Sequence, residues 1–176
     1  ILVQRQSFVT IHGPGIVCGN RMNQSATAPL STYEGGEEMR ANSGIVVYDS
    51  CFVRIKGLTV RNATLHNVSF RYAENCEATG VETYGANDKN IASVRTSRLR
   101  LVDNDAHDSV QEDGIIFYTA GHLALVGKNR IVDNRRLGLH VNPSCRFVTS
   151  IRNVMQGNGS NMTLVEGDER QSFSIE

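Results

Sequence analysis

The feature that most constrains the fold is a unit of about 23 residues that repeats along the middle of the chain. Each copy starts with a short alternating apolar run, turns through small or polar residues and gives a second apolar run, often closing near an Asn. The copies begin at Gly44, Asn67, Asn90, Gly114 and Gly138. A fixed period in this range predicts a solenoid, in which each unit packs mainly on its two neighbours.

The apolar runs of the repeat predict strands rather than helices. Segments such as FVRIKGLTV, VSFRY and LALVG alternate apolar and polar residues and are rich in Val, Ile and aromatic side chains. No stretch combines apolar residues at helical spacing with capping signals. Short strands and polar corners in coils of this length predict an all-β, right-handed parallel β-helix of about six to seven coils, as one domain over residues 1–176.

Stacking of the units predicts columns of like side chains. One alternation of the first strands points four pairs inward: Ile45 and Val47, Val68 and Phe70, Ile115 and Phe117, Leu139 and Val141. The Asn residues that close each unit are expected in turns, where Asn tolerates left-handed backbone, or in a ladder of stacked amides. They are Asn62, Asn87, Asn104, Asn134 and Asn158. The polar segment 22–43 breaks the repeat and predicts a loop.

Charge and hydropathy exclude several classes of partner. The 18 Lys and Arg residues balance 18 Asp and Glu residues, whereas a nucleic-acid-binding domain usually has a basic excess. No apolar run reaches the roughly 18 residues of a membrane helix. We therefore expect neither a nucleic-acid partner nor membrane insertion. Both ends read as uncapped coils, so we expect a segment of a longer protein, with other domains or copies stacked on its open ends.

Glycosylation signals point to an extracellular or cell-surface protein, and the cysteine positions leave the disulfide state open. Cys51 and Cys76 follow the first strand of consecutive units, so stacking could bring them within disulfide range, although two free buried thiols are the alternative. Signals for N-linked glycans occur at Asn23, Asn62, Asn67, Asn158 and Asn161. A solenoid rich in Asn, Ser and Thr also forms such signals without carrying glycans, so the localisation is an expectation.

Three segments resemble the parallel β-helix repeats of the pectin-lyase-like superfamily, over roughly Phe8 to Asn158. VTIHGPGIVCGN is similar to a coil that comes early in such proteins, RIKGLTVRNA to a coil of polygalacturonase-like members, and NRRLGLHVNPS to coils of alginate-modifying relatives. The resemblance implies the fold strongly and the activity weakly, because this superfamily also contains binding and structural proteins.

The resemblance to polygalacturonase-like enzymes implies one set of candidate catalytic residues. These enzymes use paired carboxylates on adjacent coils, one as acid and one as base. The carboxylates nearest to those positions are Asp88, Glu112 and Asp113, but Leu137 stands where a His is expected before Gly138. The segment RIK also precedes the acidic positions, which is the reverse of the family order.

The resemblance to alginate epimerases and related lyases implies a second set. Their motif of Asp, Pro, His and Asp is nearest to residues 105–108, which read DAHD with Ala in place of Pro. Removing a proton beside a carboxylate needs a base, an acid and a group that neutralises the charge of the sugar. Asp105, His107 and Asp108 could supply the first two, with Arg71 or Arg95 as the third. A polar loop between two coils is the alternative interpretation.

The outward face of the first strands is the predicted ligand surface. Its candidate ligand-binding residues are Tyr48, Arg71, Arg95, Tyr118 and His140. Tyr and Arg contact sugars and acidic polysaccharides through stacking and bidentate hydrogen bonds, and no carboxylate is expected on this face. The acidic run 105–113 lacks the glycine and the alternation of a calcium loop, so we expect no metal and no cofactor.

The sequence favours a non-catalytic extracellular scaffold or recognition segment of a larger protein, one that could contact carbohydrate. The alternative is a carbohydrate-active enzyme, either a polysaccharide lyase, an epimerase or an atypical glycoside hydrolase acting on an acidic polysaccharide. The incomplete catalytic patterns and the neutral charge favour the scaffold, and the acidic runs keep the enzyme open. His12, His66 and His122 are expected to be surface or turn residues.

Overall fold

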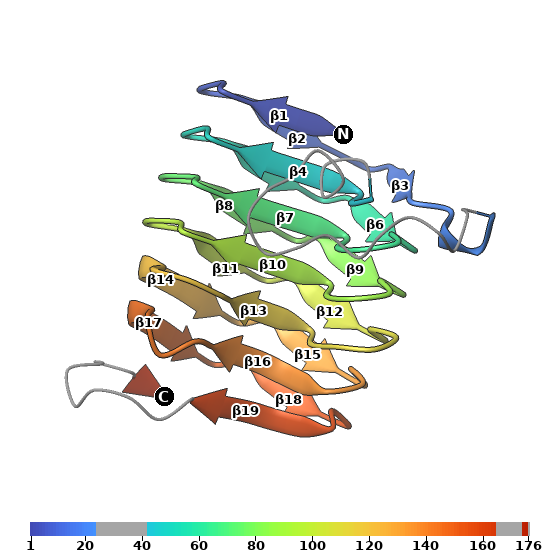
Figure 1. The fold of residues 1–176 in the computed structure, drawn as a ribbon, viewed down its shortest axis with the longest axis vertical. Coiled ribbons are helices and arrows are strands. Elements are labelled where there is room, and N and C mark those ends of the chain that lie inside the picture. Colours follow the sequence, from blue (N-terminus) through green and yellow to red (C-terminus); the bar gives the residue numbers. More distant parts are fainter. Residues whose placement is uncertain (24–41, 165–173, 176) are drawn as a thin grey trace.

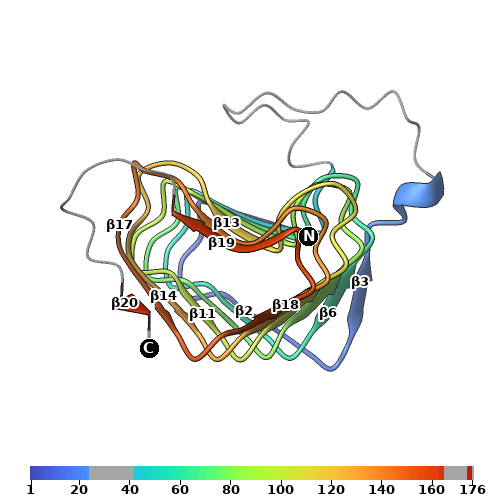
Figure 2. The ribbon, with the colours of Figure 1, turned by 90° about the horizontal axis from the view of Figure 1, so that it is seen from below.

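The computed structural model describes residues 1–23, 42–164 and 174–175, which wind into a parallel β-helix (Figure 1). Each full coil contributes one strand to each of three sheets, and the view along the axis shows these sheets as three faces around a common core (Figure 2). The predicted all-β solenoid is confirmed. The predicted loop 22–43 lies mostly outside the described residues.

Strands of the described residues pair in parallel with the strand of the coil above and below. Sheet A runs in the order β1 (Leu2–Gln4), β4 (Ile45–Tyr48), β7 (Val68–Arg71), β10 (Ile91–Val94), β13 (Ile115–Phe117), β16 (Leu137–Val141) and β19 (Ser160–Leu164). Sheet B runs in the order β2 (Thr10–His12), β5 (Arg54–Lys56), β8 (Glu77–Thr79), β11 (Arg100–Val102), β14 (His122–Gly127), β17 (Arg146–Ile151) and β20 (Ser174–Ile175). Sheet C contains β3 (Ile16–Cys18), β6 (Thr59–Arg61), β9 (Glu82–Tyr84), β12 (Asp105–His107), β15 (Arg130–Val132) and β18 (Val154–Gln156).

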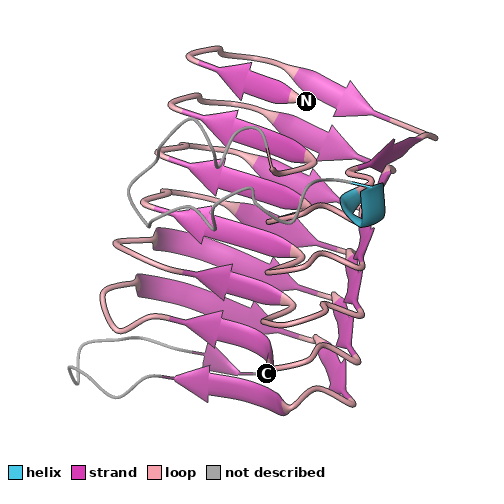
Figure 3. Ribbon diagram, turned by 45° about the vertical axis from the view of Figure 1, so that its right-hand side comes forward, coloured by secondary structure: helices cyan, strands magenta, loops and turns pink. Residues whose placement is uncertain are grey.

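Short loops join the strands at the corners, and the helical turn η1 (Arg21–Asn23) lies beside the stack after β3 (Figure 3). No helix in the described part of the chain is long and apolar enough to cross a bilayer.

The core consists of columns of aliphatic and aromatic side chains that run along the helix axis. Ile45, Val68, Ile91, Ile115 and Leu139 pair in register across five neighbouring strands of sheet A, and all five are fully buried. A second column, two residues further along each strand, contains Val47, Phe70, Phe117 and Val141. Each fully buried side chain of this size contributes about 1.5–3 kcal/mol. The predicted inward pairs are therefore confirmed.

One Asn ladder runs along the corner between sheets B and C. Asn104 Nδ2 donates to Asn129 Oδ1 at 3.0 Å, and Asn129 Nδ2 donates to Asn153 Oδ1 at 2.9 Å. At the start of the ladder, the Val81 N–H donates to Asn104 Oδ1 at 2.9 Å. Each amide therefore satisfies polar groups of two coils at a corner where the strand hydrogen bonds are interrupted.

A second ladder runs along the corner between sheets C and A. Asn67 donates to Asn90 at 2.8 Å, Asn90 to Asn134 at 2.9 Å, and Asn134 to Asn158 at 3.0 Å. The Nδ2 group of Asn134 also donates to the carbonyls of two coils, and its Oδ1 accepts the backbone N–H of Ser109. This ladder ties the returning loops to the strands of sheet A.

The five Asn residues predicted to line a turn or ladder divide into three groups. Asn104, Asn134 and Asn158 belong to the ladders, whereas Asn62 instead takes the left-handed conformation with φ 55°. Asn87 joins neither ladder and is half-buried. The sequence therefore predicted correctly that an Asn recurs once in each coil. It did not show that these Asn residues occupy two different corners, where their side-chain amides have different roles.

Glycine stands at the start of two coils beside sheet A, directly before β13 and within β16, because ladder amides approach the backbone there. A Cβ added to Gly114 would lie 2.6 Å from Asn134 Nδ2, and one added to Gly138 would lie 2.8 Å from Asn158 Nδ2. Both separations are shorter than real Cβ contacts. The small residue at this point of the repeat therefore lets the loop from sheet C pack against sheet A.

The predicted disulfide between Cys51 and Cys76 is wrong in this structure, because both side chains are free thiols. Cys51 pairs in register with Glu74, and Cys76 lies opposite Val53 of the adjoining coil. The two cysteines are thus displaced by two positions along the coil instead of lying one above the other. Burial raises the pKa of the Cys76 thiol, which keeps it protonated.

Candidate functional site

Ionisable side chains gather at the edge of sheet A, where the loops from sheet C return to the strands. The cluster is built from successive coils, because each returning loop places charged or imidazole side chains just before its strand of sheet A, and β16 itself adds His140. We call these residues the edge cluster: His66, Asp88, Lys89, Glu112, Asp113, Arg136 and His140.

One half of the edge cluster is a buried pair of opposite charges. Lys89 Nζ lies 2.5 Å from Asp88 Oδ1, and it also lies 5.2 Å from the centre of the Tyr118 ring. Burial raises the pKa of the Asp88 carboxyl, and the attraction of Lys89 offsets only part of this effect. The negative charges of Glu112 and Asp113 add to the increase, so three carboxylates of neighbouring coils act on one another electrostatically.

His66 is buried beside this pair and stays neutral. Its Nδ1 atom lies 3.3 Å from Asp88 Oδ2 without forming a hydrogen bond. Burial lowers the pKa of His66 to about 3, and the positive charges of Lys89 and Arg71 act in the same direction. His66 lies in the corner loop between β6 and β7, as the sequence predicts, but it is not at the surface, because only 3% of the residue is exposed.

The other half of the edge cluster contains a buried carboxylate that orients a histidine. Asp113 is fully buried, its Oδ1 accepts the Leu137 N–H at 3.1 Å, and its Oδ2 lies 3.0 Å from His140 Nδ1. Arg136 donates to Glu112 at 2.8 Å and lies 3.9 Å from Asp113. His140 Nε2 makes no hydrogen bond to the described residues, so it is available to a ligand.

The outward-pointing residues of sheet A form a buried column beside this cluster. Val46, Ser69, Ala92 and Ile116 follow one another in register, and each is at most 1% exposed. His140 continues this column. The expectation that no carboxylate reaches the face is wrong, because Asp113 enters from the preceding loop and contacts His140.

The predicted ligand-binding residues do not all lie on that face. Tyr48 and Arg71 pair in register, and Tyr118 follows the end of β13 on the same side. Arg95 instead occupies the corner between sheets A and B with φ 50°, where its guanidinium group lies over the Tyr72 ring at 5.5 Å. Val94 takes the place in the column that was predicted for Arg95, because the strand keeps a strict alternation to its end.

The candidate motif at 105–108 lies on sheet C, on a different face from the edge cluster. His107 Nδ1 lies 2.6 Å from Asp108 Oδ2, its Nε2 lies 3.7 Å from Glu82 Oε1, and its ring stacks on Tyr84 at 5.1 Å. Both ring nitrogens therefore face carboxylates of this chain. The structure does not bring this histidine together with the carboxylates of the edge cluster.

Asp105 of the same motif is held by an arginine of the next coil. Arg130 Nη1 donates to both carboxylate oxygens of Asp105, at 2.8 and 3.0 Å. This strip of sheet C is an ordinary set of partly exposed ion pairs. Among the described residues, no group of three or more His, Cys, Asp or Glu side chains is arranged to hold a metal ion.

The five predicted glycosylation signals differ in accessibility. Asn67 is fully buried and its amide is committed to the ladder, so the prediction that it carries a glycan is wrong. Asn158 is also a ladder member, and Asn62 is half-buried. Asn23 and Asn161 are exposed. Glycosylation of these two remains a prediction.

The family comparison matches residues 15–174 to the family described as a right-handed β-helix region. The match covers most of the chain, and the chain belongs to this family. The resemblance inferred from VTIHGPGIVCGN and the neighbouring coils is confirmed at the level of the fold. A search of curated proteins found no match.

Solved structures with a similar fold include enzymes that act on acidic polysaccharides. The pectate lyase Pel9A is 14% identical, with a TM-score of 0.62, and the match covers 77% of this chain and 34% of that one. The A-module of the Azotobacter vinelandii mannuronan C-5 epimerase AlgE6 is 11% identical, with a TM-score of 0.56 and coverage of 71% and 47%. A periplasmic alginate epimerase, AlgG, is 15% identical, with a TM-score of 0.53 and coverage of 73% and 37%. At these identities the likeness shows the fold alone, and the chain spans less than half the length of each.

Sequence reasoning missed three members of the edge cluster, namely His66, Lys89 and Arg136. All three stand in the loop that precedes a strand of sheet A, at the same offset from the strand as Asp88, Asp113 or Glu112. An alignment of the repeats by this loop, rather than by the strand alone, is the signal that could have found them.

Proposed function

We propose that this chain is part of an enzyme that transfers protons on an acidic polysaccharide, in the manner of a lyase or an epimerase, at the edge cluster of sheet A. The observation that carries the proposal is the buried Asp113 carboxylate hydrogen-bonded to His140, with the second imidazole nitrogen free. The sequence alone favours a non-catalytic scaffold, and this proposal replaces that interpretation. The likeness to a pectate lyase and to alginate epimerases supports the substrate class.

In the proposed reaction His140 is the base. Asp113 holds the imidazole in the tautomer that carries its proton on Nδ1, which leaves the Nε2 lone pair to accept a proton from the substrate. The hydrogen next to the carboxylate of a uronate is acidic only if the developing negative charge is neutralised. Arg136 is half exposed beside His140, so it could bind that carboxylate after giving up part of its contact with Glu112.

The electron pair of the broken C–H bond then has two outcomes. It can expel the adjacent glycosidic oxygen, which gives an unsaturated product, or it can accept a proton on the opposite face, which inverts the carbon. The candidate proton donor is Asp88, because burial raises the pKa of its carboxyl above the ordinary value.

The experiment is incubation of the chain with polygalacturonate, mannuronate-rich alginate and guluronate-rich alginate. Unsaturated products are followed by ultraviolet absorbance, and inversion is followed by proton NMR. We expect His140→Ala to lower the rate by about 10²–10⁴-fold, as for loss of a general base. His107→Ala on sheet C is the matched control and should keep the wild-type rate. Equal activity in His140→Ala and wild type would exclude the proposal.

A non-catalytic recognition segment is the second candidate function. The observation in its favour is that the carboxylates of Asp88, Glu112 and Asp113 all have a basic partner within the chain, as in a structural ion-pair network. It predicts polymer binding without turnover on all three polymers. We propose an extracellular or cell-surface location in either case, with other domains or copies stacked on the ends of the helix. Periplasmic origin of one relative and the exposed Asn23 and Asn161 support that location.

A further inference from the structure

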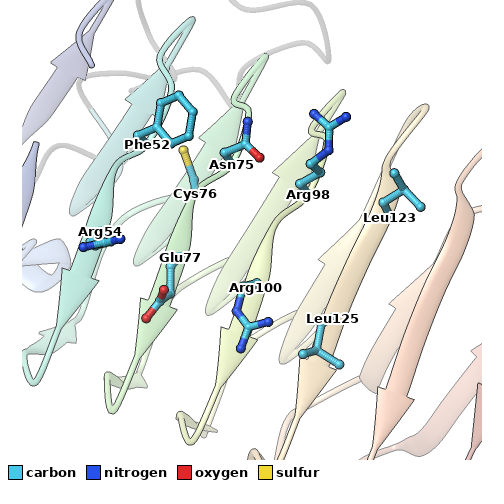
Figure 4. A pocket seen from close by; sticks show the side chains of 9 residues that line it. All are labelled: Phe52, Arg54, Asn75, Cys76, Glu77, Arg98, Arg100, Leu123 and Leu125. Atoms are coloured by element: carbon cyan, nitrogen blue, oxygen red, sulfur yellow. The ribbon is translucent and has the colours of Figure 1, made fainter. Parts of the chain in front are cut away.

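Sheet B carries an open groove of about 410 Å³ on its outer face, away from the edge cluster (Figure 4). Two rows of side chains border it, and both run along the helix axis across four coils. The row at the corner between sheets A and B contains Phe52, Asn75, Arg98 and Leu123, and the row on the strands contains Arg54, Glu77, Arg100 and Leu125.

Backbone geometry fixes the first row. Phe52, Asn75, Arg98 and Leu123 all take the left-handed conformation, with φ between 52° and 55°. This conformation costs roughly 1–2 kcal/mol for a residue with a side chain, and hydrogen bonds to adjacent coils hold it in place. It turns the side chains outward, so that Phe52 is 43% and Leu123 is 54% exposed. The row is a ridge of apolar and cationic groups beside the sheet.

Register fixes the second row. Arg54 pairs with Glu77, Glu77 with Arg100, and Arg100 with Leu125, so their side chains leave the same face of sheet B at the strand spacing of about 4.8 Å. One coil, that of Glu77, therefore lies between Arg54 and Arg100. Both arginines are exposed, and neither forms an ion pair or a side-chain hydrogen bond with the described residues.

The groove and its rim carry an excess of positive charge within a chain whose net charge is zero. Two carboxylates face four cations. The cations are Arg54, Lys56, Arg98 and Arg100, and the carboxylates are Glu74 and Glu77. Arg98 is paired with Glu74, and Lys56 is paired with Glu77 at 3.4 Å. The two unpaired guanidinium groups are thus the local excess.

We propose that this groove is a second binding site, which holds a chain of uronate sugars along the helix axis. Arg54 and Arg100 each bind one carboxylate, because a guanidinium group donates two parallel hydrogen bonds to such a group. Phe52 and Leu123 contact the apolar faces of the sugar rings. The choice of a uronate chain rests on the proposed function, and the groove would keep the polymer attached while the edge cluster acts on another part of it.

A nucleic acid is the other polyanion that such a groove could attract, and two observations favour the uronate. The chain as a whole lacks the basic excess of a nucleic-acid-binding domain. Among the described residues that line the groove, Phe52 is the one aromatic side chain, and Phe8 stacks on it at 4.9 Å. Proteins that bind single strands instead stack successive bases on several separate aromatic rings.

The test is isothermal titration with size-defined oligogalacturonate and oligomannuronate, with a dextran oligomer as the uncharged comparison. The variant Arg54→Ala/Arg100→Ala should weaken binding by roughly tenfold or more, since a hydrogen bond to a charged group contributes about 1.5–3 kcal/mol. The control Arg130→Ala/Arg152→Ala removes the same charge from exposed arginines outside the groove and should keep the wild-type affinity. Added salt should weaken wild-type binding.

A second variant acts in the opposite direction. Glu77→Gln removes the negative charge that lies between Arg54 and Arg100 in register and repels a uronate carboxylate, so it should tighten oligogalacturonate binding. The proposal is overturned if the groove variant binds as wild type does, if the control pair loses as much affinity, or if a DNA oligonucleotide of equal charge binds as tightly as the uronates. Rates on short substrates separate the two proposals: a chain that binds through the groove without turnover overturns only the catalytic one.

Discussion

The edge cluster of sheet A and the strip of ion pairs on sheet C (Asp105, His107, Asp108 and Arg130) contain the same kinds of side chain in opposite surroundings. Each has an Asp–His contact, 3.0 Å for Asp113 and His140 and 2.6 Å for Asp108 and His107. The Asp113 side chain is fully buried, whereas that of Asp108 is 65% exposed. An Asp–His contact therefore says little about chemistry until the burial of the two side chains is known, because desolvation decides how strongly their charges interact.

The sharpest way to break this comparison is to remove one carboxylate from each region. Asp113→Ala should lower the free energy of unfolding by about 3–5 kcal/mol, because it removes the acceptor of the Leu137 N–H and the counter-charge of a buried network. Asp105→Ala should cost about 0–1 kcal/mol, because its ion pair with Arg130 is partly exposed. Urea denaturation of both variants measures the difference. Equal losses would mean that the two regions do not differ in burial as described.

The corner between sheets C and A, which separates the two regions, depends on the second Asn ladder. Asn134→Ala should lower the free energy of unfolding by about 2–3 kcal/mol, because each buried group left without a partner costs about 1–3 kcal/mol. Asn87→Ala, in the same corner but outside the ladder, should cost far less. Thermal and urea unfolding of the pair give the measurement. A large effect at Asn87 together with a small one at Asn134 would contradict the assigned ladder.

The pH dependence of the free energy of unfolding tests the burial of the edge cluster at His66. The pKa of the folded state is lowered to about 3 from an ordinary value near 6.5, so the unfolded chain binds more protons between these values. Stability should therefore fall by about 1.4 kcal/mol for each pH unit as the pH is lowered through this window. The raised pKa of Asp88 acts oppositely, making stability fall as the pH rises above its ordinary value.

The measurement is the free energy of unfolding of wild type and His66→Gln at several values of pH. The difference between the two proteins should be constant above pH 6.5 and should shift in favour of the variant below it. Asp88 is present in both proteins, so its contribution largely cancels. A difference that is independent of pH would show that His66 is not held neutral by burial.

The smallest effect is expected for a surface pair of sheet C. Arg130→Ala breaks a contact in which the two side chains are 53% and 36% exposed, so the loss should be about 0–1 kcal/mol and should disappear in high salt. Denaturation at low and at high ionic strength measures it. A loss of several kcal/mol that persists in salt would place this strip among the buried networks.

The period and the alternation of the sequence were enough to predict the coil. Ile45, Val68, Ile115 and Leu139 lie where a repeat of two inside a repeat of about 23 must place them, because parallel pairing of successive coils leaves one register. The same argument from the repeat gave the wrong register for Cys51 and Cys76, by two positions. Cys76 directly precedes β8, whereas Cys51 stands two positions further from the start of β5, and the spacing of 25 residues did not reveal this difference.

The candidate site was predictable only in part, since its members come from loops. Asp88, Glu112 and Asp113 were found through their resemblance to a catalytic pattern, and His140 was found as an outward residue of a strand. Their contact was not predicted, because a short loop can turn its side chains towards the sheet or away from it. The ladder at Asn90 and Asn134 makes that choice here, by tying the loops down beside sheet A.

By itself, the order of residues determined the architecture of this protein, since apolar periodicity acts through burial and needs no knowledge of distant contacts. Tertiary structure alone decided which polar groups share an environment. Folding set Asp113 and His140 together in a water-excluded edge, left Asp108 and His107 partly in solvent, and aligned Arg54 with Arg100 across three coils. Charge interactions depend on distance and solvent exposure, and both quantities exist only after the coils have stacked.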